Sequence, residues 1–229
     1  MYWPLMEETI TLKDRLKMAA FILTSSRLTN GPKVRQLEEK WSEWLGVKHS
    51  LYVSSGSTAN TLLVSSIKEH YGLKDGDKVL VPACTWVTNI APVIQANLEP
   101  IFCDINLDNY SFDEEELKYI AEQHPDIKAV FITHLIGLSS DVEKVKEIFP
   151  NALIMEDVCE SHGVEGPNGK RGRDSVGSTF SFYFGHHITT IEGGMVCTNN
   201  SDLYQLMRMK RSHGMAREAS PELFKKYSA

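Results

Sequence analysis

The sequence predicts an α/β fold in which a mostly parallel sheet carries helices on both faces. Short apolar stretches that are typical of strands alternate with longer stretches of helical composition from residue 50 to residue 211. Such alternation is typical of parallel strands that are joined by helices. The stretch at residues 128–133 is apolar almost throughout, as expected of a strand that is buried on both sides.

The first half of the pattern supplies three strands and two helices. The strand candidates are residues 50–54, 78–82 and 99–104. Residues 57–70 have helical composition. A further helical stretch covers about residues 86–96, and we expect Pro92 to disturb it because proline lacks a backbone N–H.

The second half continues the alternation and then departs from it. A helix is expected to begin at residues 113–116, because these acidic residues suit the positive end of a helix dipole. A loop rich in glycine and arginine spans residues 166–177. The other expected elements are strands at 128–133, 152–157, 178–184 and 194–198, and helices at 141–149 and 201–211.

Composition and charge exclude several classes of protein. The chain has 229 residues, of which 42% are hydrophobic and 24% charged, which is ordinary for a globular protein. The net charge of −6 excludes the broad basic surface of a general nucleic-acid binder. No apolar run approaches the ~18 residues that a membrane span requires. We therefore expect neither a nucleic-acid partner nor a membrane span.

The cysteines and the N-terminus indicate where the protein works. Cys84, Cys103, Cys159 and Cys197 are widely spaced and form no CxxC motif or Cys/His cluster, so no metal site is expected. Residues 1–8 have neither the basic start nor the apolar core of an export signal. Both features favour a location in the reducing cytoplasm.

A strand-to-turn-to-helix junction at residues 53–60 is the first candidate site. Small residues, among them Gly56 and Ser57, lead from the strand into the helix. A helix N-terminus offers free backbone N–H groups and a partial positive charge, which suit a phosphate. The alternative is ordinary capping of the helix by Ser or Thr. The turn is not a P-loop, because the Gly-Lys-Ser/Thr ending is missing.

A second candidate follows the strand at residues 152–157. Asp157 ends this strand, at the edge of an open α/β sheet where ligands bind. Glu160 and His162 follow within five residues. The alternative is a solvated loop with a capping aspartate.

Two further features lie near other strand ends. Trp86 follows the strand at 78–82, where a flat ring can stack on a planar cofactor, although tryptophan is most often a core residue. His186 and His187 lie between an aromatic stretch and the pair Gly193-Gly194. Taken alone, adjacent histidines are more often structural than functional.

Together these segments resemble the DegT/DnrJ/EryC1/StrS family of sugar aminotransferases and dehydratases, which are pyridoxal 5'-phosphate (PLP) proteins of fold type I. The resemblance extends from residues 2–5 to residues 211–214 and includes segments at 28–32, 81–83, 102–105 and 134–137. It implies a mostly parallel seven-stranded sheet flanked by helices, and a homodimer. Family members are nearly twice as long. We therefore expect residues 1–229 to be the PLP-binding large domain of a partial chain that lacks the C-terminal small domain, and residues 221–226 look like an element that is cut short.

The resemblance also implies a role for each candidate residue. Asp157 would pair with the pyridine nitrogen of the cofactor, and Trp86 would stack on its ring. Glu160 matches the position that contacts the ring hydroxyl. The phosphate would be held by Gly56, Ser57 and Ser181.

The departure from the family pattern concerns the residue that binds the cofactor covalently. Aminotransferases of the family have a lysine where this sequence has His186, and residues 173–209 contain no lysine. Ile191 stands where relatives have glycine. Histidine cannot attach the cofactor, but it can move protons near neutral pH. His186 at this position resembles a small branch of the family, the sugar 3-dehydratases, and would be the catalytic base and acid.

The resemblance thus implies a 3-dehydratase that uses PLP and its amine form, pyridoxamine 5'-phosphate (PMP). It would act on a nucleotide-linked 4-keto-6-deoxyhexose, with GDP as the nucleotide and L-glutamate as the amine donor, in deoxysugar and polysaccharide synthesis. Another histidine-bearing branch uses an iron–sulfur cluster whose cysteines follow soon after the Arg-x-x-Gly stretch, and none follows here. Two alternatives stay open: a sugar aminotransferase, and a non-catalytic PLP-fold protein that binds a ligand or regulates.

Overall fold

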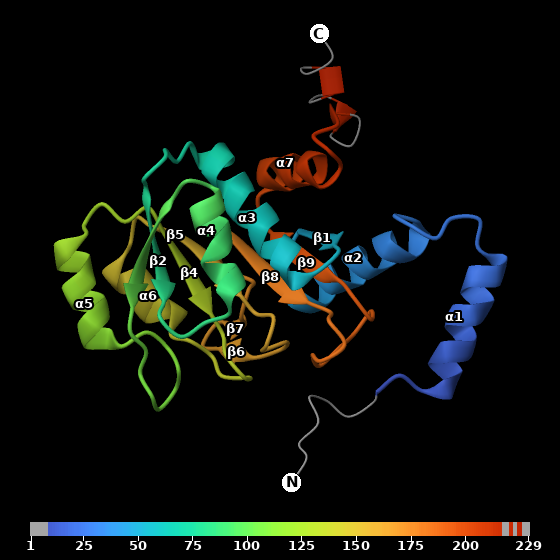
Figure 1. Cartoon of the computed structure of the whole chain (residues 1–229), viewed down its shortest axis with the longest axis horizontal. Coiled ribbons are helices and arrows are strands. Elements are labelled where there is room, and N and C mark those ends of the chain that lie inside the picture. Colours follow the sequence, from blue (N-terminus) through green and yellow to red (C-terminus); the bar gives the residue numbers. More distant parts are fainter. Residues whose placement is uncertain (1–8, 217–219, 222–223, 226–229) are drawn as a thin grey trace.

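The computed structural model describes residues 9–216, 220–221 and 224–225. Residues 2–5, at the start of the family resemblance, lie outside this part, as do residues 222, 223 and 226 of the stretch at 221–226. The centre of the molecule is a seven-stranded sheet with the order β1-β9-β8-β5-β4-β2-β3 (Figure 1). Its strands are β1 (His49–Val53), β2 (Lys78–Pro82), β3 (Glu99–Cys103), β4 (Ala129–Thr133), β5 (Leu153–Asp157), β8 (Gly177–Ser181) and β9 (Gly194–Thr198).

The sheet is mostly parallel, as the sequence predicts. Strands β3, β2, β4, β5 and β8 form parallel pairs with their neighbours. Strand β9 runs antiparallel to both β8 and β1. The predicted fold class and the number of strands are therefore confirmed.

Helices cover both faces of the sheet (Figure 1). Helices α3, α4 and α7 pack on one face, and α5 and α6 pack on the other. The bounds are α1 (Leu12–Thr24), α2 (Pro32–Leu45), α3 (Gly56–Tyr71), α4 (Ala91–Gln95), α5 (Glu114–Gln123), α6 (Val142–Ile148) and α7 (Ser201–Arg211). Within the described ranges, no helix combines the length and the apolar character that crossing a membrane requires.

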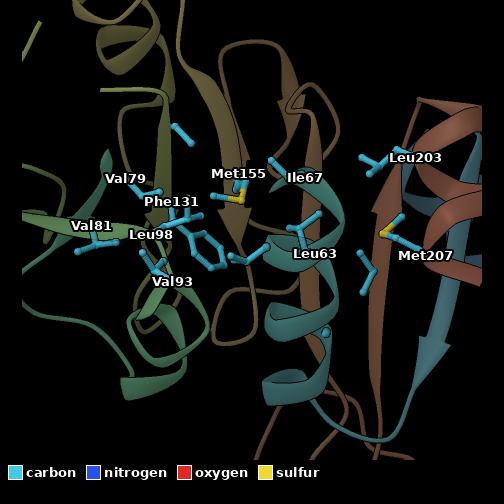
Figure 2. Packing of buried hydrophobic residues seen from close by; sticks show 14 of the residues in the cluster. Leu63, Ile67, Val79, Val81, Val93, Leu98, Phe131, Met155, Leu203 and Met207 are labelled. Carbon is cyan, nitrogen blue, oxygen red and sulfur yellow. The ribbon is translucent and has the colours of Figure 1, made fainter. Parts of the chain in front are cut away.

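The alternation of side chains along each strand places separate hydrophobic clusters on the two faces of the sheet. Val79 and Val81 of β2 belong to the cluster beneath α3, whereas Leu80 belongs to the cluster beneath α5 and α6. Figure 2 shows Leu63 of α3 beside the strands that carry Phe131 and Met155. Helix α3 is therefore anchored along its length, and its N-terminus is held at a defined place on the sheet edge.

Three local expectations differ from the structure. Pro92 does not disturb a helix but lies in the first turn of α4, where a missing N–H costs nothing, and the preceding η1 (Val87–Asn89) is a separate 3₁₀ turn. The strand expected at 178–184 ends at Ser181. The loop at 166–177 contains a short hairpin of β6 (Glu165–Gly166) and β7 (Gly169–Lys170).

Helices α1 and α2 were not predicted, although local sequence signals indicate where each begins or ends. Thr11 and Asp14 form a reciprocal capping box at the start of α1. Helix α2 begins with Pro32 and ends at Gly46, whose φ of 82° is the left-handed conformation typical of a helix C-cap.

Candidate active site

A cavity of about 470 Å³ opens at the edge of the sheet where strands β4, β5 and β8 end. The N-terminus of α3 and the loop between β8 and β9 complete its wall. The seven residues to which the family resemblance assigns a role all line this one cavity. They are Gly56, Ser57, Trp86, Asp157, Glu160, Ser181 and His186.

The carboxylate of Asp157 is the most firmly oriented polar group of the cavity. Asp157 ends β5 and is 3% exposed. Its Oδ2 accepts hydrogen bonds from the amide groups of Asn60, at 2.9 Å, and Asn89, at 3.0 Å. Its Oδ1 accepts from the backbone N–H of Cys159 at 2.9 Å. The Asn60 amide is itself oriented, because its oxygen accepts from the hydroxyl of Thr179 at 2.6 Å.

The start of α3 is pressed against the end of β8. Ser55 caps the helix, accepting a hydrogen bond from the backbone N–H of Thr58 at 3.1 Å. A Cβ atom on Gly56 would lie 2.8 Å from Cβ of Ser181 and 3.0 Å from Sγ of Cys159. Because a glycine occupies this position, the helix N-terminus lies directly at the cavity wall, where its first N–H groups lack partners within the helix.

The loop that carries His186 is fastened at both ends. Phe182 donates a backbone hydrogen bond to Gly193 at 2.8 Å, and it accepts one from Thr190 at 3.1 Å. The hydroxyl of Tyr52 donates to the carbonyl of Glu192 at 2.9 Å. A Cβ on Gly194 would lie 2.2 Å from the Ser55 carbonyl oxygen, so this close approach of the loop to the α3 turn requires glycine.

The environment of His186 favours its neutral form. Burial lowers the pKa of His186 below its ordinary value of 6.5, whereas the carboxylates of Glu160 and Asp157 raise it and His187 lowers it. The net direction is downward, so the imidazole is free to accept a proton at neutral pH.

Trp86 and Glu160 line the cavity from the segments that follow β2 and β5. Trp86 immediately precedes η1 and is 62% exposed, so its ring is open to a ligand. Glu160 follows β5 in the loop, and its Oε2 accepts a hydrogen bond from the backbone N–H of Ile136 at 3.3 Å.

Ile191, in the His186 loop, has a φ of 74°, a conformation that favours glycine and is strained for a β-branched residue.

None of the fourteen described residues that line the cavity is a lysine. The nearest upstream lysine, Lys170, lies in β7, where its Nζ is 5.4 Å from the centre of the Trp44 ring. In the described part of the chain, no group of three or more His, Cys, Asp and Glu side chains is arranged to hold a metal ion.

Sequence reasoning missed the residues that orient the predicted ones. Asn60 and Asn89 hold Asp157, yet they lie on α3 and at the end of η1, 97 and 68 positions away. Tyr183, Thr133 and Glu192 also line the cavity. His162, which was also singled out, does not line it, and its ring nitrogens are buried.

The fold and the cavity define an α/β domain of the aminotransferase type, with a carboxylate, a helix N-terminus and a histidine facing one space. The DegT/DnrJ/EryC1/StrS aminotransferase family matches residues 10–228, and the chain belongs to this family.

Relatives with assigned activities are similar along nearly the whole chain. GDP-4-keto-6-deoxy-D-mannose 3-dehydratase from Yersinia pseudotuberculosis is 36% identical over 220 residues, which are 94% of this chain and 55% of that protein. Its Escherichia coli O55:H7 counterpart matches over 51% of its length. The chain therefore spans about half the length of these curated relatives.

Solved structures of the same kind of enzyme superpose closely. A histidine-to-asparagine variant of GDP-4-keto-6-deoxymannose-3-dehydratase with bound GDP-perosamine is 31% identical, with a TM-score of 0.88 over 94% of this chain and 56% of that chain. The enzyme with a trapped PLP–glutamate geminal diamine is 29% identical, with a TM-score of 0.90 over 100% of this chain and 62% of that chain.

Proposed function

We propose that this chain is the cofactor-binding part of a PLP/PMP-dependent sugar nucleotide 3-dehydratase. It would remove the C3 hydroxyl of a GDP-linked 4-keto-6-deoxyhexose with L-glutamate as the amine donor. The observation that carries the proposal is His186, in a lysine-free cavity that retains every other cofactor-binding residue the family pattern implies. The enzymes named in the comparisons support the substrate class, the glutamate and the cofactor.

The residues that line the cavity suit the chemistry of PLP. A carboxylate held by three donors suits a ring nitrogen that must carry a proton, and Asp157 is placed for this role. The N–H groups of Gly56 and Ser57, together with the hydroxyl of Ser181, suit the phosphate. Trp86 would stack on the ring and Glu160 would contact its hydroxyl.

The protein's own residues would then accept, donate and hold the protons of the reaction. When bound, the cofactor supplies an electron-accepting ring that makes an attached carbon acidic and allows the C3 hydroxyl to leave. His186, neutral and facing the cavity, would take the proton from that carbon and return one later. Asp157 would keep the ring nitrogen protonated.

A product assay distinguishes this function from its two alternatives. A full-length version of the protein is incubated with PLP, L-glutamate and GDP-4-keto-6-deoxymannose, and products are followed by mass spectrometry and ammonia release. A dehydratase yields a 3-deoxy sugar and ammonia. A 4-amino sugar without loss of the C3 oxygen would identify an aminotransferase. PLP binding without any product would indicate a non-catalytic protein.

The proposal includes a homodimer and a cytoplasmic location. Figure 1 shows α1 away from the sheet, and the exposed fractions of its Leu12, Leu16 and Leu23 are 72%, 63% and 84%. Such an apolar surface is typical of a helix that is covered by a partner. The four cysteines are free thiols, as in proteins of a reducing compartment. Light scattering tests the dimer, and a monomer at micromolar concentration that still binds PLP would contradict it.

A further inference from the structure

The imidazole of His162 lies in an aromatic box behind the wall of the cavity. Its ring stacks on Phe180 and Phe182, with ring centres 5.8 and 5.9 Å apart and interplanar angles of 14° and 9°. The edge of Trp41 closes the box at 5.8 Å. Every one of these contacts is available to a phenylalanine, so packing does not explain why the residue is a histidine.

Both ring nitrogens of His162 are buried, and among the described residues neither makes a hydrogen bond of ordinary geometry, although the backbone of Ser181 lies near enough to interact. Buried polar atoms without partners are rare in folded proteins, because they lose their bonds to water and gain nothing in return. The apolar surroundings lower the pKa of His162 to about 3, with burial as the largest cause, the neighbouring His187 and His186 as further causes, and the backbone of Ser181 acting weakly against them. The ring therefore stays neutral and keeps one nitrogen as a hydrogen-bond acceptor at every working pH.

The open side of the box faces the two histidines of the loop between β8 and β9. The ring of His162 is nearly perpendicular to those of His187 and His186, with ring centres 5.4 and 6.1 Å apart. His187 is exposed, so water can satisfy its nitrogens. His186 is partly buried and lines the cavity. It is therefore the neighbour for which a protein acceptor matters.

We propose that His162 positions His186 by accepting a hydrogen bond from its inward ring nitrogen, which leaves the other nitrogen free to face the cavity as the base. This inference rests on the proposed role of His186. Which nitrogen of a histidine carries the proton is set by the bond that the other makes. Catalytic hydrogen bonds are often long in the unloaded enzyme and tighten on loading, which accounts for ring edges that meet without a hydrogen bond.

The proposed bond suits both states of the base. Before proton transfer, neutral His186 donates its inward N–H to His162, and its outward lone pair is available. After transfer the inward N–H is still a donor, now on a charged ring, and the bond becomes stronger. His162 never has to change its own protonation, because its burial keeps it neutral.

The test compares His162→Phe, which keeps the aromatic stacking and loses the acceptor, with His162→Gln, which keeps an acceptor. In the PLP-loaded protein with ¹⁵N-labelled histidine, NMR reports the tautomer of His186 directly. We expect one tautomer in the parent and a mixture in His162→Phe, with His162→Gln closer to the parent. For turnover, kcat should fall on the order of 10–100-fold in His162→Phe with KM nearly unchanged, and His162→Gln should recover part of the loss.

Stability and a control variant separate positioning from packing. His162→Phe should unfold at a temperature no lower than the parent, because the apolar ring removes two unpaired nitrogens. Trp41→Phe disturbs the same box from a side that does not touch His186, so it should lower stability and leave the tautomer unchanged. Parental kcat together with an unchanged His186 tautomer in His162→Phe would overturn the inference. A different result is that the His186 tautomer changes in His162→Phe although the parent has no dehydratase activity. That result would support the positioning by His162 and refute the proposed function.

Discussion

Asn60 and Asp157 are 97 positions apart in the chain, yet the amide of Asn60 donates to Oδ2 of Asp157 at 2.9 Å. The contact joins the second turn of α3 to the last residue of β5. Since the same helix begins at Gly56, it holds the two ends of the candidate cofactor site together. One rigid helix therefore sets both the phosphate end and the ring end of the cavity.

Replacing Asn60 with alanine should weaken PLP binding about tenfold, because Asp157 loses one of the donors that orient it and the loss of such a bond costs about 1–2 kcal/mol. Absorbance titration with PLP measures the change. Asn168→Ala, on the exposed hairpin, serves as the control and should bind PLP like the parent. Equal affinities in the two variants would show that Asn60 does not support the site.

The cofactor should bind without covalent attachment, since no lysine lines the cavity. Borohydride treatment of the PLP-loaded protein, followed by mass spectrometry of peptides, should leave no pyridoxyl group on residues 9–216. His186→Lys supplies the missing amine and should produce such an adduct on its own peptide. A stable adduct on a lysine of the parent would refute the expectation.

His186→Asn should lower dehydration by about 10²–10⁴-fold, the usual contribution of a general base or acid. Asparagine is similar in size but does not titrate near neutral pH. PLP affinity should be unchanged, because Asp157, Ser57, Ser181 and Trp86 remain. His187→Asn is the matched control, since His187 is exposed and does not line the cavity. If His186→Asn formed as much 3-deoxy product as the parent, His186 would not be the base and another residue would have that role.

The buried pair of His134 and Glu156 should make the fold sensitive to acid. Their Nε2 and Oε2 atoms are 2.9 Å apart, and the two side chains are 0% and 2% exposed. Burial raises the pKa of Glu156, but the hydrogen bond from His134 and the N–H of Gly172 outweigh it, so the net pKa lies below the ordinary 4.5. A carboxyl with a lowered folded-state pKa stabilises the fold above its unfolded pKa, and this contribution is lost as the pH falls below about 4.5.

Urea unfolding as a function of pH measures this effect. His134→Leu should lower the free energy of unfolding by about 3 kcal/mol near neutral pH, since it leaves a buried carboxylate without its main partner. Lys118→Ala, which removes an exposed ion pair with Glu114, should have no measurable effect. Equal stabilities of parent and His134→Leu across the pH range would show that the pair does not contribute.

Local sequence patterns were enough to predict most of the sheet and the identity of the site. Apolar strands, the Ser-Gly-Ser turn and Asp157 at a strand end are each readable within a few residues, because backbone periodicity and helix capping depend on near neighbours. The family resemblance added Ser181 and assigned roles to Trp86, Glu160 and His186, and all four line one cavity.

The sequence pattern was less informative at boundaries. It extended the strand at 178–184 by three residues, because an aromatic stretch continues past Ser181. Phe182 instead turns into the loop, where its backbone bonds Gly193 and Thr190. Pro92 was taken as a disturbance, but the separate 3₁₀ turn before it lets the proline begin a helix.

Sequence alone thus determines the class of fold and the chemical identity of the groups at the strand ends, since both depend on residue type and local spacing. The supporting groups of the site depend on packing over long distances. Asn60 and Asn89 reach Asp157 because α3 and η1 lie over the end of β5. His162 meets His186 because both border the aromatic box beneath β8. Sequence neighbours do not show which of these residues contact one another. The arrangement of the sheet and its helices therefore decides these contacts.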